Sequence, residues 1–60
     1  MGSYRSHTEH AAKLRKRAEE CRKLADVVKT HRAEEAYREL ADAYEMLAVD
    51  EERLALQFKQ

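Results

Sequence analysis

The sequence predicts an all-α protein that folds as an antiparallel two-helix hairpin. The chain has 60 residues, no proline and a single glycine, Gly2, so almost every signal for turns and β-sheets is missing. Apolar residues recur with a helical period in both halves, and the pattern breaks at residues 29–31. We expect one domain over residues 1–60, with helices at about 6–29 and 31–58 joined by a turn at about 29–31. One bent helix of about fifty residues is the alternative.

The first helix is expected to bury one stripe of side chains. Leu14, Cys21 and Val28 recur every seven residues, and alanines and Leu24 flank them. Heptad spacing keeps side chains on one face of a helix, so this pattern predicts an amphipathic helix.

The turn is predicted from capping chemistry, since it contains neither glycine nor proline. Thr30 is the best candidate to cap the second helix, because its hydroxyl can accept a hydrogen bond from a free backbone amide there. Glu34 and Glu35 follow near the positive end of that helix, where carboxylates are favourable. Lys29 and a protonated His31 would suit the negative end of the first helix.

The second helix has a wider apolar surface than the first. Leu40, Leu47 and Leu54 recur every seven residues, with aromatic residues at the four-residue offset. The apolar arc spans about 160° on a helical wheel, which is more than one partner helix covers. A second copy of the hairpin is therefore expected to bury the remainder by forming an antiparallel four-helix bundle.

An antiparallel register then assigns the core. Residues whose numbers sum to about 61 face each other across the hairpin, which pairs Cys21 with Leu40 and Leu14 with Leu47. The expected core comprises Leu14, Cys21, Leu24, Val28, Tyr37, Leu40, Tyr44, Leu47, Leu54 and Phe58. An outer contact surface is expected at Met46, Val49 and Leu56.

The two halves carry opposite charge although the whole chain is neutral. Residues 1–32 hold nine basic and four acidic side chains, and residues 33–60 hold three and eight. The run KLRKR at positions 13–17 could contact nucleic-acid phosphates. Acidic residues at helical contact spacing, Glu19 and Asp26, favour instead a salt-bridged, solvated face. Nucleic-acid binding is therefore disfavoured but remains an alternative.

Histidine and cysteine are the candidates for chemistry. His7, His10 and Glu51 should meet at the open end of the hairpin, where they are weak candidates for a divalent metal site. The other interpretations are exposed histidines that pair loosely with Glu51 or Glu52, a pH-sensitive pairing of His10 with Glu51, and a simply solvated bundle end. Cys21 is expected in the core, with a disulfide across a two-fold axis as its alternative role. We expect no catalytic residues, no metal and no cofactor.

Two segments resemble a known group of proteins. AEECRKLA at residues 18–25 and LADAYEMLA at residues 40–48 resemble small uncharacterised helical-hairpin proteins of alphaproteobacteria, including rhizobia. The resemblance covers about residues 10–48 and implies the same hairpin fold in a bacterial protein. Many members have Asp-Pro at the turn, where this chain has Thr30-His31. The resemblance implies no activity, ligand or site residue.

The sequence favours a non-enzymatic interaction or scaffold protein that associates with itself through an apolar helical face. The main alternative is a regulatory or accessory subunit that docks on a larger complex. No apolar run approaches the roughly 18 residues needed to span a bilayer, so we expect a soluble, cytoplasmic protein with no membrane insertion.

Overall fold

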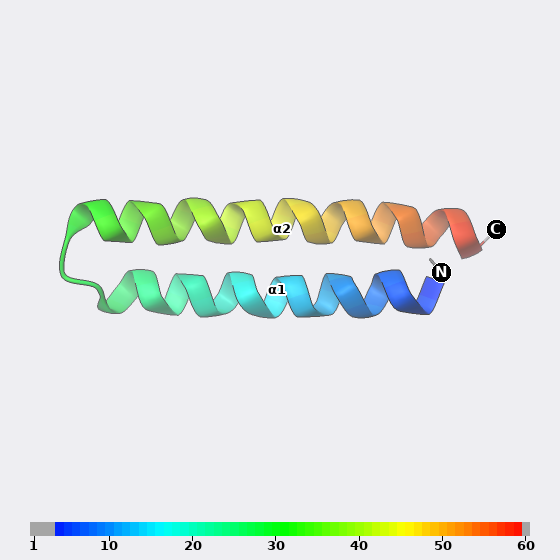
Figure 1. Cartoon of the computed structure of the whole chain (residues 1–60), viewed down its shortest axis with the longest axis horizontal. Coiled ribbons are helices and arrows are strands. Elements are labelled where there is room, and N and C mark those ends of the chain that lie inside the picture. The colour runs from blue at the N-terminus through cyan, green and yellow to red at the C-terminus, as the bar shows by residue number, and fades with distance from the viewer. Residues whose placement is uncertain (1–3, 60) are drawn as a thin grey trace.

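The computed structural model of the chain describes residues 4–59, without the side chain of residue 59. It contains helix α1, Tyr4–Val27, and helix α2, His31–Lys59, which run antiparallel and pack against each other along their length (Figure 1). The predicted all-α hairpin is therefore present, and the alternative single bent helix is not formed. Helix α1 begins and ends two residues earlier than the sequence predicted, and α2 ends one residue later.

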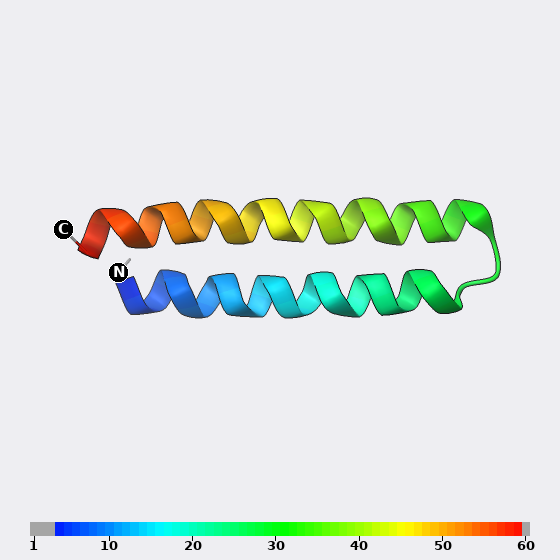
Figure 2. The same ribbon diagram turned by 180° about the vertical axis from the view of Figure 1, so that it is seen from behind.

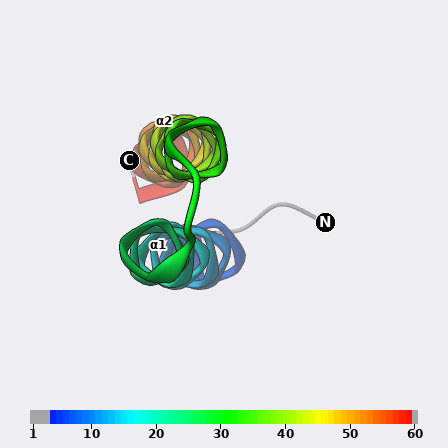
Figure 3. The same cartoon turned by 90° about the vertical axis from the view of Figure 1, so that its left-hand side faces the viewer.

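The molecule is a rod made of one layer of two helices. Its principal extents are 46 × 14 × 13 Å, and the turn lies at one end, with the start of α1 and the end of α2 at the other (Figures 1 and 2). Seen end-on, the two helices cross at a small angle, as expected where heptad-spaced side chains form the contact (Figure 3).

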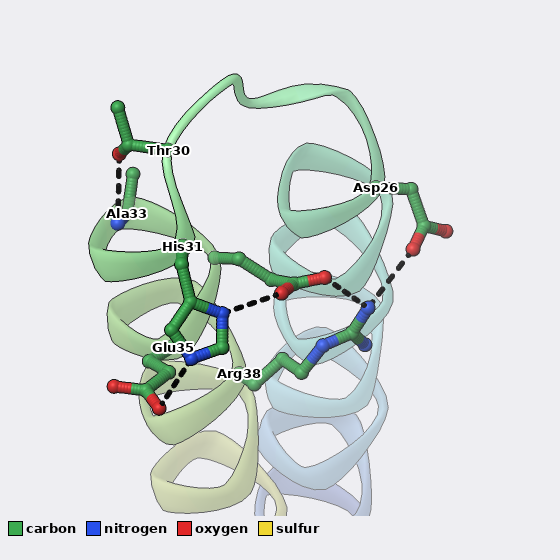
Figure 4. Close-up of polar contacts among 7 residues, drawn as sticks. Asp26, Thr30, His31, Ala33, Glu35 and Arg38 are labelled. Atoms are coloured by element: carbon green, nitrogen blue, oxygen red, sulfur yellow. Dashed lines mark hydrogen bonds and ion pairs between the residues drawn. The ribbon is translucent and has the colours of Figure 1, made fainter.

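The turn has the predicted cap. The Ala33 amide donates to the Thr30 hydroxyl over 3.1 Å (Figure 4). The Glu34 amide donates to the Thr30 carbonyl over 3.1 Å. Thr30 thus satisfies amide groups that the first turn of α2 leaves unpaired.

The expected charges at the end of α1 are not found. Helix α1 ends at Val27, so Lys29 lies in the turn, and the last turn of α1 has no basic residue. His31 instead lies on α2, with Nδ1 3.4 Å from Glu34 and Nε2 3.0 Å from Glu35. The lack of a basic last turn follows from the earlier end of α1, which leaves Lys29 outside the helix.

The seam between the helices is built from small residues. Among the described residues, the buried side chains are Ala11, Ala18, Cys21 and Ala25 of α1 with Ala41, Ala48 and Ala55 of α2. Ala18, Cys21 and Ala41 form a cluster, and Tyr44 packs against it. Alanines of both helices therefore meet at the seam, and tyrosine fills the space beside them.

This arrangement corrects the expected pairing of Cys21 with Leu40. The leucines were expected to supply the inner face of α2, but Leu40, Leu47 and Leu54 are 43%, 50% and 40% exposed. Helix α2 is rotated about its axis, so that the alanine row faces α1 and the leucine row lies beside the seam. The lengthwise register is close to the prediction, since Cys21 still meets residues near position 41.

Candidate interaction surface

The rotation of α2 produces two unlike faces on either side of the alanine seam. We call one the charged face; its residues are Arg15, Arg22, Asp26, Arg38, Glu45 and Glu52. We call the other the leucine face; its residues are Leu24, Leu40, Leu47 and Leu54. Heptad spacing relates Arg15 to Arg22 on α1, and on α2 it relates Arg38, Glu45 and Glu52 on one side and Leu40, Leu47 and Leu54 on the other.

Ion pairs between the helices cover the charged face. Arg22 contacts Glu45 with both terminal nitrogens of its guanidinium group, at 3.4 Å from Nη1 to Oε1 and 3.1 Å from Nη2 to Oε2. Arg15 forms a hydrogen-bonded ion pair with Glu52. These contacts join the basic first helix to the acidic second helix within one chain.

A third set of ion pairs lies on the charged face near the turn. Arg38 Nη2 donates to Asp26 Oδ1 over 3.1 Å and to Glu34 Oε2 over 3.3 Å (Figure 4). One guanidinium therefore links α1 to the start of α2. The expectation that Asp26 pairs within α1 is replaced by this contact between helices.

The ion pairs shift the pKa of their members in the directions that favour charge. The hydrogen bond and nearby charge of Glu45 raise the pKa of Arg22, and those of Arg22 lower the pKa of Glu45. Hydrogen bonds to Glu34 and then Asp26 raise the pKa of Arg38. These shifts favour the charged forms of Arg22, Arg38 and Glu45. The basic residues Arg15 and Arg22 thus already have acidic partners in the chain.

The leucine face, by contrast, is exposed. Leu24 is 44% exposed, and the three leucines of α2 are exposed to a similar degree. An open groove of about 490 Å³ crosses this face, lined by His10, Lys13, Leu14, Arg17, Leu47, Asp50 and Glu51. Its apolar contribution comes from Leu14 and Leu47, and the remaining lining residues can carry charge. The groove therefore combines an apolar floor with charged residues along its sides.

The open end of the rod brings the two amino-terminal histidines to Glu51. His7 Nδ1 forms a hydrogen bond with Glu51 Oε2, and the His7 ring stacks on Phe58 with centroids 5.4 Å apart. His10 Nδ1 lies 3.9 Å from Glu51 Oε1. An ionised carboxylate only accepts, so His7 is the donor to Glu51. Of the two histidines, His7 therefore makes the closer contact with Glu51.

The three weak metal candidates lie together but are engaged with one another. Within residues 4–59, no group of three or more His, Cys, Asp or Glu side chains is placed to hold a metal ion. The His7 ring nitrogen that faces Glu51 is used in their hydrogen bond, and its ring is stacked on Phe58. The geometry supports a side-chain clamp that ties the start of α1 to the end of α2.

Cys21 lies in the seam and not on either face. Its side chain is buried against Ala18 and Ala41, and its thiol is free. A disulfide between two copies would require the hairpin to open at this point. The position suits a small apolar side chain.

The remaining expected contact residues lie outside the seam. Met46 and Leu56 are exposed on α2, as is Val49 to a smaller extent. Met46 and Val49 line a shallow surface hollow together with Asp42 and Glu45. They form a second exposed apolar area, separate from the leucine row by about a quarter turn or more on the helical wheel.

The sequence interpretation missed the residues that orient α2. Ala41, Ala48 and Ala55 also recur every seven residues, and the acidic Glu45 and Glu52 stand four residues after Ala41 and Ala48. On a helix this places a carboxylate row beside an alanine row. Together with Arg15 and Arg22 at the same heptad spacing on α1, it was the available signal for the observed rotation.

Comparison with known proteins adds no assignment. Searches against protein-family models, curated proteins and solved structures found no match to this chain. The resemblance to alphaproteobacterial hairpin proteins therefore stays a prediction. In the part of the chain that is described, neither helix is apolar enough over sufficient length to cross a bilayer.

Proposed function

We propose that this protein is a small, non-enzymatic interaction module that associates with itself through its leucine face. The observation that carries the proposal is the row of leucines at heptad spacing, each about half exposed, on one side of an otherwise completed seam. Leucines at this spacing on a helical surface are the usual contact residues between packed helices. The product is a dimer in the form of a four-helix bundle.

The small core supports this assignment. Among residues 4–58 the buried side chains are six alanines and one cysteine, which remove little apolar area from water. Domains of about 60 residues are marginally stable even with larger cores, and oligomerisation is a common way to stabilise them. Burial of the leucine rows would add the large side chains that the single hairpin leaves out.

The exposed area also matches what a dimer requires. The chain exposes 4944 Å², whereas a compact protein of 7.0 kDa exposes about 4000 Å². The excess, roughly 900 Å², is close to the ~800 Å² that each partner buries in a standard interface. One long face of the rod supplies this area without any change in the hairpin.

The charged face is a poorer contact surface. Its guanidinium and carboxylate groups already satisfy each other, and removing them from water would cost free energy without a new partner to compensate. The leucine face gains from the same burial. The free energy of burial therefore favours the leucine face over the charged face as the docking surface.

Sedimentation with one matched pair of variants tests the proposal. We expect the unmodified chain to be a dimer at low micromolar concentration and Leu47→Lys to raise the dissociation constant at least about 100-fold, because a charge then enters an apolar contact. The control is Leu56→Lys, the same change on the other side of α2, which should leave the dimer intact. A folded monomer at about 100 μM, or equal effects of both variants, would contradict the proposal.

A second candidate function is docking on a larger protein, as an accessory or regulatory subunit. Met46 and Leu56, 68% and 58% exposed, favour it because they lie away from the leucine face and stay available in the dimer. In that case Leu56→Lys should leave sedimentation unchanged and abolish capture of the partner from native cells. The expected cytoplasmic location stays a prediction.

A further inference from the structure

We infer that the two copies join with their turns at the same end, so that α1 of each protomer lies over α2 of its partner. This inference rests on the proposed self-association and specifies its geometry. The occupant of the leucine face is then a second copy of this chain, related by a two-fold axis parallel to the helices.

Two symmetric arrangements can bring one leucine face onto another. If the two-fold axis is parallel to the helices, the turns coincide and each α1 covers the partner's α2. If the axis lies across the helices, the turns are at opposite ends and each α1 covers the partner's α1. Both bury the same leucines, so the apolar contact does not decide between them.

The charges along the groove distinguish the two arrangements. Lys13 and Arg17 line it from α1, and Asp50 and Glu51 line it from α2. Within residues 4–59, Lys13, Arg17 and Asp50 form no ion pair, whereas Glu51 is held by His7. When α1 covers the partner's α2, the basic residues Lys13 and Arg17 face the acidic residues of the partner. When α1 covers the partner's α1, these basic residues face their own copies.

The register of the helices shows which charged residues would lie at the same height in each arrangement. His10 faces Glu51 within the hairpin, so residues whose numbers sum to about 61 lie at the same height along the rod. An axis parallel to the helices preserves height, which puts Lys13 within about 3 Å of the level of the partner's Asp50 at 1.5 Å rise per residue. An axis across the helices at the middle of α1, near residue 15, places Arg17 at about the level of the partner's Lys13, where like charges repel.

The apolar side chains near the turn agree with the same choice. Leu24 stands at the height of residues 36–37, so in the inferred dimer it covers the partner's Ala36. Ala36 is exposed and small, and a large side chain opposite a small one fills such a contact without a void.

A distance between the two turns tests the geometry directly. A nitroxide label on Lys29→Cys, in a chain with Cys21→Ala, gives one label per protomer in the exposed turn. In the inferred dimer the labels should lie within about 30 Å, since packed helices are 8–10 Å apart and the label arms add to this. In the reversed dimer they should be separated by nearly the 46 Å length of the rod.

The outcomes separate this inference from the proposed function. A dimer with a long label distance overturns the geometry and leaves self-association in place, whereas a monomer with no dipolar coupling overturns both. Circular dichroism and sedimentation of the labelled chain show whether Cys21→Ala has kept the fold.

Charge reversal gives a second test with native Cys21. Lys13→Glu should weaken the inferred dimer about two- to fivefold, and adding Asp50→Lys should restore it. In the reversed dimer Lys13→Glu should strengthen association, because it removes repulsion from the partner's Arg17. That increase would overturn the inference.

Discussion

The charged face and the leucine face lie on opposite sides of the same seam, yet only one is complete within the chain. On the charged face, guanidinium groups of each helix meet carboxylates of the other at 3.1–3.4 Å. On the leucine face, the large apolar side chains have water on one side. The hairpin pairs these charges internally and leaves its leucine side chains partly exposed.

This difference shows how the orientation of one helix determines which side chains of a small hairpin stay exposed. The ion pairs and the alanine rows set the rotation of α2, and that rotation determines which residues are left outside. With the leucines in the seam, as the sequence suggested, the hairpin would have a larger core and less apolar surface to offer. The small core and the exposed leucine face therefore have the same cause, the rotation of α2.

The largest effect on the fold should come from enlarging the seam that separates the two faces. Ala18 is fully buried against Cys21 and Ala41. Ala18→Leu adds methylene groups where no space exists, so it should lower the free energy of unfolding by about 1–3 kcal/mol, and by more if the helices separate. Thermal or urea unfolding at a fixed protein concentration measures this loss.

Ala12→Leu is the matched control on the same helix. Ala12 is exposed, so the same change should alter the free energy of unfolding by less than about 0.5 kcal/mol. If Ala18→Leu is tolerated equally well, Ala18 is not packed closely between the helices, and the alanine seam that separates the two faces is wrong.

The seam is also where prediction from sequence reached its limit. Helix positions, the capping role of Thr30 and the lengthwise register followed from periodicity and capping chemistry, which are local properties. The rotation of α2 depends on which of two heptad rows, Leu40 or Ala41, faces a partner. Hydrophobicity favoured the leucines, whereas packing against small residues and cross-helix pairs such as Arg22 with Glu45 favoured the alanines.

The open end shows the same limit. The register predicted that Glu51 would meet the histidines, and it does. The stacking of His7 on Phe58 depends on side-chain rotamers and could not be read from spacing.

An intermediate effect is expected at the turn, which holds both faces in register. Thr30→Ala removes the hydroxyl that accepts from the Ala33 amide, and should lower the free energy of unfolding by about 1 kcal/mol. Thr30→Ser keeps the hydroxyl and should stay within a few tenths of a kcal/mol. Equal losses in the two variants, measured by urea unfolding, would show that the hydroxyl is not the stabilising group.

The smallest effect is expected on the charged face and should depend on pH. Because Arg22 lowers the pKa of Glu45, the folded chain binds a proton at Glu45 less readily than the unfolded chain does. The stabilisation is fully present above the ordinary glutamate pKa of about 4.3 and is lost as the pH falls through the lowered pKa. Glu45→Gln should therefore be less stable than the unmodified chain at pH 7, with a difference that shrinks towards pH 3.

Glu39 provides the comparison that isolates this effect. It is exposed, and among the described residues it forms no ion pair, so Glu39→Gln removes a carboxylate from α2 without removing a salt bridge. Urea midpoints measured from pH 7 to pH 3 for the three chains separate the Arg22–Glu45 pair from the general titration of carboxylates. A Glu45→Gln difference that stays flat with pH would mean that the charged face is held by packing of the seam and not by this ion pair.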